Sequence, residues 1–251
     1  MTRTYQHGRI HHFNFWGKVM KHAKQWLAAG LALGMTSLNA SMPAQAEFFV
    51  QGVDVLDTDQ NVIWMRDANL LNTLEGTTTG SYNTLIAAII STHKGTVADT
   101  PDYFDGGSKK HTLTAADFKA GGFADYWGAI AFVKYLNFIR YGGSNKWTLP
   151  EVGRDASLGY SQTGDAYGAL FYNELGGIAT GPMPSGPFLN VQTAVDDSGD
   201  YSAYWFASTY APNANYAWNF CSSNGFQWFS RKDFMMYVWP ARPGKTEPAL
   251  D

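Results

Sequence analysis

The stretch Tyr204–Gly244 reads YWFASTYAPNANYAWNFCSSNGFQWFSRKDFMMYVWPARPG, and its pattern is the strongest structural signal in the C-terminal part of the chain. It holds four of the nine tryptophans, and its aromatic runs are separated by Asn, Ser and Gly. Aromatic runs bounded by turn residues predict short strands. Rigid rings beside small polar groups also suit a surface that contacts a ligand. The pattern therefore predicts strands, and recognition more than chemistry.

Residues 1–46 have the pattern of a secretory signal peptide. They contain five basic residues and no acidic one, followed by an apolar run from Trp26 to Leu38 and by Ala44-Gln45-Ala46. A basic region, a short apolar core and an A-x-A site are the parts of such a signal, and this core is too short to span a bilayer. A start at Met20 would give a signal of more ordinary length. We therefore expect the chain to be secreted, periplasmic or exposed at the cell surface.

The rest of the chain is acidic. The whole chain has a net charge of −3, and removing the five basic residues of the signal leaves −8. Nucleic acids and anionic membranes bind basic surfaces, so neither is an expected partner. No later stretch is apolar enough to span a membrane. We expect one domain over residues 47–244 and a disordered tail over 245–251; the oligomeric state stays open.

Cys221 is the only cysteine, so the domain has no internal disulfide and depends on packing. Its thiol either is buried as a small apolar group or forms an intermolecular bridge. Burial is favoured, because free cysteine is among the most buried residue types.

Apolar periodicity predicts an α+β fold. Val50–Arg66 alternates like a β-hairpin around a turn at Asp57–Asn61. Three helices are expected, each followed by glycine: Ser81–His93, Asp125–Arg140 and Asp165–Leu175. Residues 96–112 have the composition of a polar loop, and short strands are expected after Tyr201. Helices in the middle with strands at both ends favour α+β over alternating βαβ units.

The second of these helices is apolar except for Lys134, Asn137 and Arg140. Their spacing of three leaves one narrow polar stripe on the helix. We therefore expect this helix to lie deep in the core, with the stripe facing solvent.

Several motifs resemble those of the Lcl C-terminal domain family, a domain of largely unknown function in secreted bacterial proteins. Val62–Asn69 reads VIWMRDAN and is similar to the family's opening motif, glmW-RDAN. The remaining matches follow in family order: the helix Tyr126–Asn137, Gly142-Gly143, Trp147–Pro150, Leu170–Gly176, Tyr204-Trp205, Ala207–Thr209, Ala217–Phe220, Gly225–Gln227 and Tyr237–Gly244.

The resemblance implies a C-type-lectin-like fold with paired N-terminal and C-terminal strands. It relates the chain to formylglycine-generating enzymes and to retroelement-diversified ligand-binding proteins. The name-giving member is an adhesin for host glycosaminoglycans, an activity that needs basic residues and does not fit this acidic chain. Relatives often carry Asn-rich runs where this chain has the mixture from Cys221 to Met235. That mixture resembles the variable face of a diversified binder, which predicts a template repeat and a reverse transcriptase gene nearby.

The resemblance also predicts which aromatic and polar residues are structural and which contact a ligand. Five tryptophans align with family markers and are expected in the core: Trp64, Trp127, Trp147, Trp205 and Trp239. Arg242 is expected to form a structural ion pair, with Asp67 or Asp125 as its partner. The candidate ligand-contacting residues are the less constrained positions: Tyr210, Asn213, Asn215, Asn219, Ser222, Asn224, Phe226, Trp228 and Arg231. Strand alternation separates Phe226 and Trp228 from Gln227 and Phe229, with one pair exposed and the other packed.

Metal-binding motifs are incomplete. Asp57, Asp59 and Asn61 have the opening spacing of a calcium loop, but Val62 and Ala68 stand where that loop needs Gly and Glu. A polar turn is therefore the favoured interpretation. A second acidic loop contains Asp196, Asp197 and Asp200. No transition-metal site is expected, because the two later histidines, His93 and His111, have no His or Cys at ligand spacing.

Catalytic motifs are incomplete too. Gly159–Gly164 misses the G-x-S-x-G elbow by one residue. Cys221 lacks the second cysteine on which formylglycine-generating enzymes depend.

The sequence thus predicts a non-enzymatic binding module that recognises a glycan or a protein at a cell surface, with calcium as the only cofactor considered. One alternative is an enzyme on the same fold, which would need a cleft with titratable groups of perturbed pKa. Another is a surface protein that self-assembles through Cys221 or the aromatic face.

Overall fold

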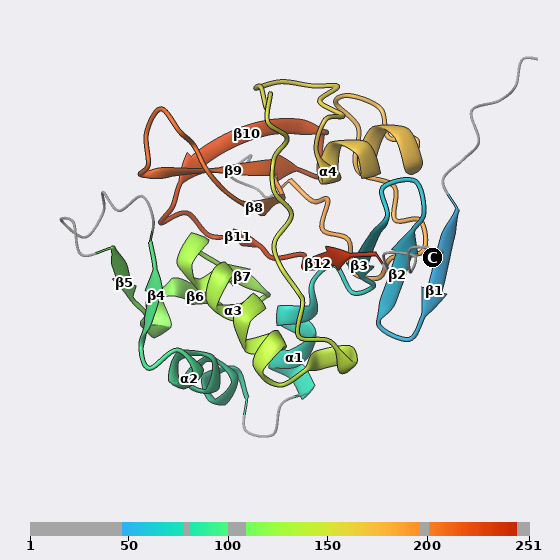
Figure 1. Cartoon of the computed structure of the whole chain (residues 1–251). Coiled ribbons are helices and arrows are strands. Elements are labelled where there is room, and N and C mark those ends of the chain that lie inside the picture. The colour runs from blue at the N-terminus through green and yellow to red at the C-terminus, as the bar shows by residue number, and fades with distance from the viewer. Residues whose placement is uncertain (1–46, 78–80, 100–108, 196–200, 245–251) are drawn as a thin grey trace, which may run out of the picture. The chain divides into compact units, whose positions relative to one another are not determined.

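The C-terminal stretch forms most of a six-stranded sheet in the computed structural model, which describes residues 47–77, 81–99, 109–195 and 201–244. Its strands are β8 (Ala203–Thr209), β9 (Tyr216–Cys221), β10 (Phe226–Arg231), β11 (Met236–Tyr237), β6 (Phe118–Lys119) and β7 (Phe123–Ala124). They follow the order β10-β9-β8-β11-β7-β6, with β10 at one edge (Figure 1). The prediction of strands after Tyr201 is confirmed.

The turn between β9 and β10 depends on Gly225. Its φ of 79° lies in the left-handed region, which favours glycine. A Cβ there would also come within 2.8 Å of the Phe171 ring. Both the backbone and the packing therefore require glycine at this turn, which sets the antiparallel register of Phe226 opposite Cys221.

The N-terminal strands form a second sheet that the last strand completes. β1 (Phe48–Gln51), β2 (Asp54–Asp57) and β3 (Val62–Met65) pair in sequence order, and β12 (Ala241–Pro243) pairs with β3. The β2–β3 hairpin confirms the expected one, whereas β1 was not predicted as a separate strand. The expected pairing of the two ends is confirmed, because Ala241 lies opposite Trp64 (Figure 1).

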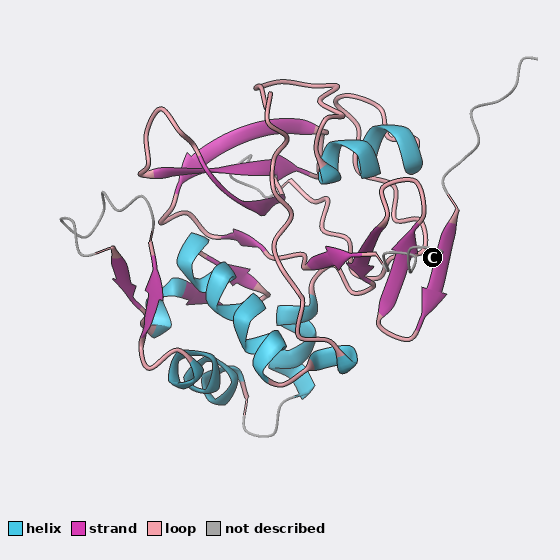
Figure 2. Ribbon diagram, in the orientation of Figure 1, coloured by secondary structure: helices cyan, strands magenta, loops and turns pink. Residues whose placement is uncertain are grey.

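The helices are α1 (Leu70–Thr77), α2 (Tyr82–Thr92), α3 (Tyr126–Phe138) and α4 (Ala166–Gly168). The predictions of α2 and α3 are confirmed, and α1 was missed. The third expected helix is instead a short α4 that continues as a π-helical turn, η3 (Ala169–Glu174). In Figure 2, α1, α2 and α3 gather together and α4 lies apart from them.

The polar stripe of α3 is not wholly a solvent face. Lys134 is exposed, but the Asn137 side chain donates to the backbone oxygen of Trp147 at 2.8 Å and accepts from its N–H at 2.7 Å. Asn137 therefore ties the helix to the Trp147 segment, so its prediction as a solvent-facing residue was wrong.

The segment expected to be a polar loop contains a two-stranded ribbon. β4 (Thr96–Ala98) pairs with β5 (Lys110–Thr112), and a 3-10 turn, η1 (Ala115–Asp117), follows. Only Val97 of β4 is buried, so the apolar alternation was too short to be recognised. The residues between these strands, 100–108, lie outside the described part.

All five expected core tryptophans are buried. Tyr167 lies among them, with its ring 5.4 Å from Trp64 and 6.1 Å from Trp239. Arg242 forms an ion pair, but with Asp54 rather than Asp67 or Asp125. Arg242 lies opposite Ile63 on β3, and β3 pairs on its other side with β2, which contains Asp54. This arrangement explains why Asp54 is the partner of Arg242.

Within the described residues, no helix is both long and apolar enough to cross a membrane. The expected signal peptide, the tail 245–251 and the acidic loop of Asp196, Asp197 and Asp200 lie outside those residues.

Candidate functional site

The candidate ligand-contacting residues divide into surface and interior positions. Trp228 is 42% exposed, and Asn213 and Arg231 are also exposed. Four others are half-buried: Tyr210, Asn215, Asn224 and Phe226. Asn219 and Ser222 are buried, so their assignment to a contact surface was wrong.

Hydrogen bonds explain why these two polar residues face inward. The Ser222 hydroxyl donates to the backbone oxygen of Gln192 at 2.6 Å. The Asn219 amide donates to the Ser230 hydroxyl at 3.0 Å across the β9–β10 pair. Buried polar groups are tolerated when they are paired in this way, so both residues stabilise the sheet.

Three of these candidates, Tyr210, Phe226 and Trp228, belong to a continuous line of rings. This line is here called the aromatic row and is defined as Tyr160, Phe226, Trp228, Phe229 and Tyr210. Successive ring centroids lie 4.7, 5.6, 5.1 and 3.9 Å apart. The last two contacts are stacked, with ring planes 5° and 15° apart. Such spacing is favourable for aromatic pairs and limits ring rotation.

The position of β10 at the sheet edge explains how this row forms. Neighbouring residues such as Trp228 and Phe229 leave a strand on opposite faces, yet their rings stack. At an edge strand no further strand separates the two faces, so rings from both can meet. Phe226 and Trp228 are the more exposed pair, since Gln227 is buried and Phe229 half-buried.

Sequence reasoning missed Tyr160 and Phe229 as members of the row. Gly159 and Gln227 exchange two backbone hydrogen bonds, of 3.1 and 2.9 Å. These bonds hold the loop that contains Gly159 against β10. Gly159, which begins the segment that resembled a nucleophile elbow, therefore extends the sheet edge. This places Tyr160 against Phe226.

Cys221 is half-buried at the end of β9. Burial raises the pKa of its thiol to about 12. The thiolate is the reactive form of cysteine, so this thiol is a poor nucleophile at neutral pH.

The calcium candidates form a polar turn. Asp57 accepts from the N–H groups of Asp59 at 3.2 Å and Gln60 at 3.1 Å, and from the Gln60 side chain at 2.9 Å. Its carboxylate is thus engaged within the turn. The same Gln60 amide donates to Glu174, and burial with the adjacent Asp57 raises the pKa of Glu174 to about 9.

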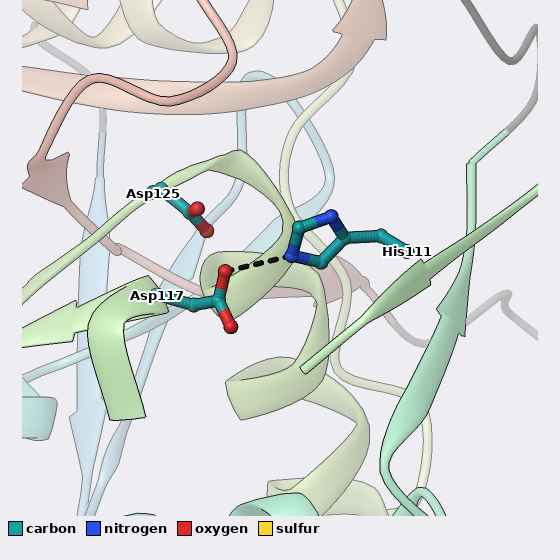
Figure 3. A group of neighbouring side chains, drawn as sticks. All are labelled: His111, Asp117 and Asp125. Atoms are coloured by element: carbon teal, nitrogen blue, oxygen red, sulfur yellow. Dashed lines mark hydrogen bonds and ion pairs between the residues drawn. The ribbon is translucent and has the colours of Figure 1, made fainter. Parts of the chain in front are cut away.

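A second group of polar side chains gathers at the start of α3 (Figure 3). His111 comes from β5, Asp117 from η1, and Asp125 is the N-cap of α3. Nε2 of His111 lies 2.7 Å from Oδ1 of Asp117. One ligand-type atom from each residue lies within 4.8 Å of the others, so the three could hold a metal ion.

The pKa values of the two carboxyl groups shift in opposite directions. Burial and the neighbouring charge of Asp117 raise the pKa of Asp125 to about 9. Burial also acts to raise the pKa of Asp117, but hydrogen bonds from His111 and Thr114 outweigh it and lower that pKa. At neutral pH, Asp125 therefore carries a proton beside an ionised Asp117.

Trp127 links this group to a buried ion pair. The His111 ring stacks on the Trp127 ring at 4.0 Å, with planes 6° apart. Nζ of Lys232 also lies over the Trp127 ring, 5.9 Å from its centroid. The same nitrogen is 2.5 Å from Oδ1 of Asp99. Five titratable residues from separate segments thus surround the start of α3.

None of these five residues was singled out by sequence reasoning for chemistry. His111, Asp117 and Asp125 are separated by six and eight positions on different elements, so no metal-ligand spacing exists. Asp117 and Asp125 carry only capping signals: Thr114 and Asp117 form a capping box, and Asp125 accepts from the Gly128 N–H. Tertiary contact alone brings them together.

No protein-family model, curated protein or solved structure gives a significant match to this chain.

Proposed function

We propose that the chain is a secreted, non-enzymatic binding module with a C-type-lectin-like fold, which captures a glycan or a protein at a cell surface. The aromatic row is the observation that carries this proposal. Residues 1–46 support secretion through their signal-peptide pattern. The paired β3 and β12 and the order of the family-like motifs support the lectin-like fold.

The aromatic row has the properties of a contact surface. Exposed indole and phenol rings can stack on sugar rings or seat protein side chains. Ring-to-ring contacts hold the row in place, so binding would cost little side-chain entropy. Polar groups occur at both ends of β10, with Asn224 in the turn before it and Arg231 at its last position.

The test is a glycan and cell-surface protein array probed with the purified chain, with and without EDTA. Trp228→Ala and Phe226→Ala should abolish capture of whichever ligand the wild type retains. Phe234→Ala is the matched control, because Phe234 is exposed but outside the row. Unchanged capture by folded Trp228→Ala and Phe226→Ala variants would refute the proposal.

An enzymatic function is the second candidate, favoured by one observation. The residues around the start of α3 include a carboxyl with a pKa of about 9 next to a His–Asp pair. Perturbed titratable groups that converge from several segments are typical of active sites, although structural networks show them too. An enzyme would chemically alter the ligand that it captures, and Asp125→Asn would stop that reaction while capture continues; a ligand recovered unaltered from the wild type would exclude this second candidate.

A further inference from the structure

We propose that His111, Asp117 and Asp125 form a binding site for a divalent transition-metal ion, for which Zn²⁺ is the best-matched probe. The site is separate from the aromatic row and does not depend on the proposed function. Its donor atoms lie within 4.8 Å of one another (Figure 3). Donors around zinc lie about 2.0–2.2 Å from the ion, so small side-chain movements bring all three into range.

Each of the three side chains is already oriented by a further contact. Stacking on Trp127 fixes the plane of the His111 ring. One oxygen of Asp117 accepts from the Thr114 N–H, and its other oxygen faces His111. One oxygen of Asp125 accepts from the Gly128 N–H at 2.7 Å. Such outer contacts orient the ligands of metal sites and raise affinity.

The charge around the cluster also favours a cation. Both carboxyl groups are buried. Among the described residues, neither pairs with lysine or arginine, because Lys232 pairs with Asp99, Arg231 with Asp233 and Arg242 with Asp54. Buried carboxylates require compensation by a partner or a metal ion, and a divalent ion that displaces the Asp125 proton would neutralise both carboxylates.

The donor set indicates the class of ion. Imidazole nitrogen suits zinc and related transition metals, whereas calcium takes six to eight oxygen donors. Three protein ligands leave one position of a tetrahedral site open for water or a further ligand. The His111 side chain is 16% exposed, which gives an ion a route to the cluster.

The test measures zinc binding by equilibrium dialysis and metal analysis of the full chain. Four other histidines, His7, His11, His12 and His22, are replaced by Gln in every sample, because they could bind zinc independently. This background chain should retain one zinc ion per chain with a Kd below about 10 µM. Failure to retain zinc at that concentration would overturn the proposal.

Variants then assign the ion to the cluster. His111→Gln and Asp125→Asn should each lower zinc affinity by about tenfold or more, whereas the control His93→Gln should not change it. Asn keeps the capping acceptor for Gly128, so Asp125→Asn should remain folded. Zinc at about 100 times the background Kd should raise Tm by roughly 5–10 °C in the background and His93→Gln chains, and by no more than about half as much in the two cluster variants. Zinc affinity equal to the background in a folded Asp125→Asn chain would exclude this site.

Discussion

Replacing Lys232 by methionine should destabilise the chain by about 3–5 kcal/mol at pH 7, because Asp99 would be left buried without a counter-ion. Nζ of Lys232 lies 2.5 Å from Oδ1 of Asp99, and the two side chains are 0% and 1% exposed. Methionine keeps most of the apolar stem, so the variant removes charge more than packing. A domain of this size loses about 2–4 °C per kcal/mol, which predicts a Tm lower by roughly 6–20 °C.

The loss of stability caused by Lys232→Met should become smaller as the pH is lowered. An isolated buried carboxylate takes up a proton more readily than the same group in the unfolded chain, and the neutral acid is tolerated. The folded variant then binds a proton that the unfolded variant does not, so its stability rises toward acid pH. The difference from wild type should narrow by up to about 1.4 kcal/mol per pH unit between pH 7 and 5.

Urea unfolding followed by tryptophan fluorescence measures these differences. Arg231→Met is the matched control, because its ion pair with Asp233 is exposed and should contribute nothing measurable. The double variant Lys232→Met, Asp99→Leu should recover most of the lost stability, since both buried charges are gone. A loss below about 1 kcal/mol in Lys232→Met that does not vary with pH would refute the buried ion pair.

Three further predictions concern other residues. In EDTA, the free energy of unfolding should fall as the pH rises from about 4 toward 9, because Asp125 and Glu174, each with a pKa of about 9, hold a proton only in the folded chain. Urea unfolding at several pH values measures this dependence, and Asp125→Asn and Glu174→Gln should each make the free energy of unfolding less dependent on pH. An unchanged dependence on pH would contradict the assignment. Gly225→Ala should lower the free energy of unfolding by about 2–5 kcal/mol, because of its positive φ and its contact with Phe171. Gly143→Ala, with a similar φ and no neighbour within 4 Å, should lower it by only about 1–2 kcal/mol. Equal losses of stability in thermal melts would exclude the packing contribution. Native Cys221, with its thiol pKa near 12, should react with iodoacetamide far more slowly than in urea, and mass spectrometry showing equal rates would refute its burial.

Local patterns predicted much of the fold. The alternation of Val53 and Val55 and the polar turn after Asp57 are short-range signals, so the β2–β3 hairpin could be derived from them. The cap at Asp125 and the apolar run after it likewise define α3. The sequence does not separate α1 in the same way, because Leu70–Thr77 is short and has few apolar positions.

The site was less predictable, because its geometry comes from tertiary contacts. Trp228 and Phe226 could be proposed from composition, but Asn219 and Ser222 have the same polar character and are buried. Arg231 and Lys232 are neighbours of like charge, yet one is exposed and the other fully buried. Burial here depends on Asp99, which is 133 positions away from Lys232.

The pairing of β3 with β12 affects how the molecule is made. The Trp239 indole donates to the Met65 backbone, and Ala241 is bonded to Thr148 on its other side. Because synthesis proceeds from the N-terminus, the sheet of β1, β2 and β3 lacks its fourth strand until Pro243 has left the ribosome. Closure over so many intervening residues is slow compared with local helix formation. The four-stranded sheet is therefore completed only after the whole stretch between β3 and β12 has been synthesised.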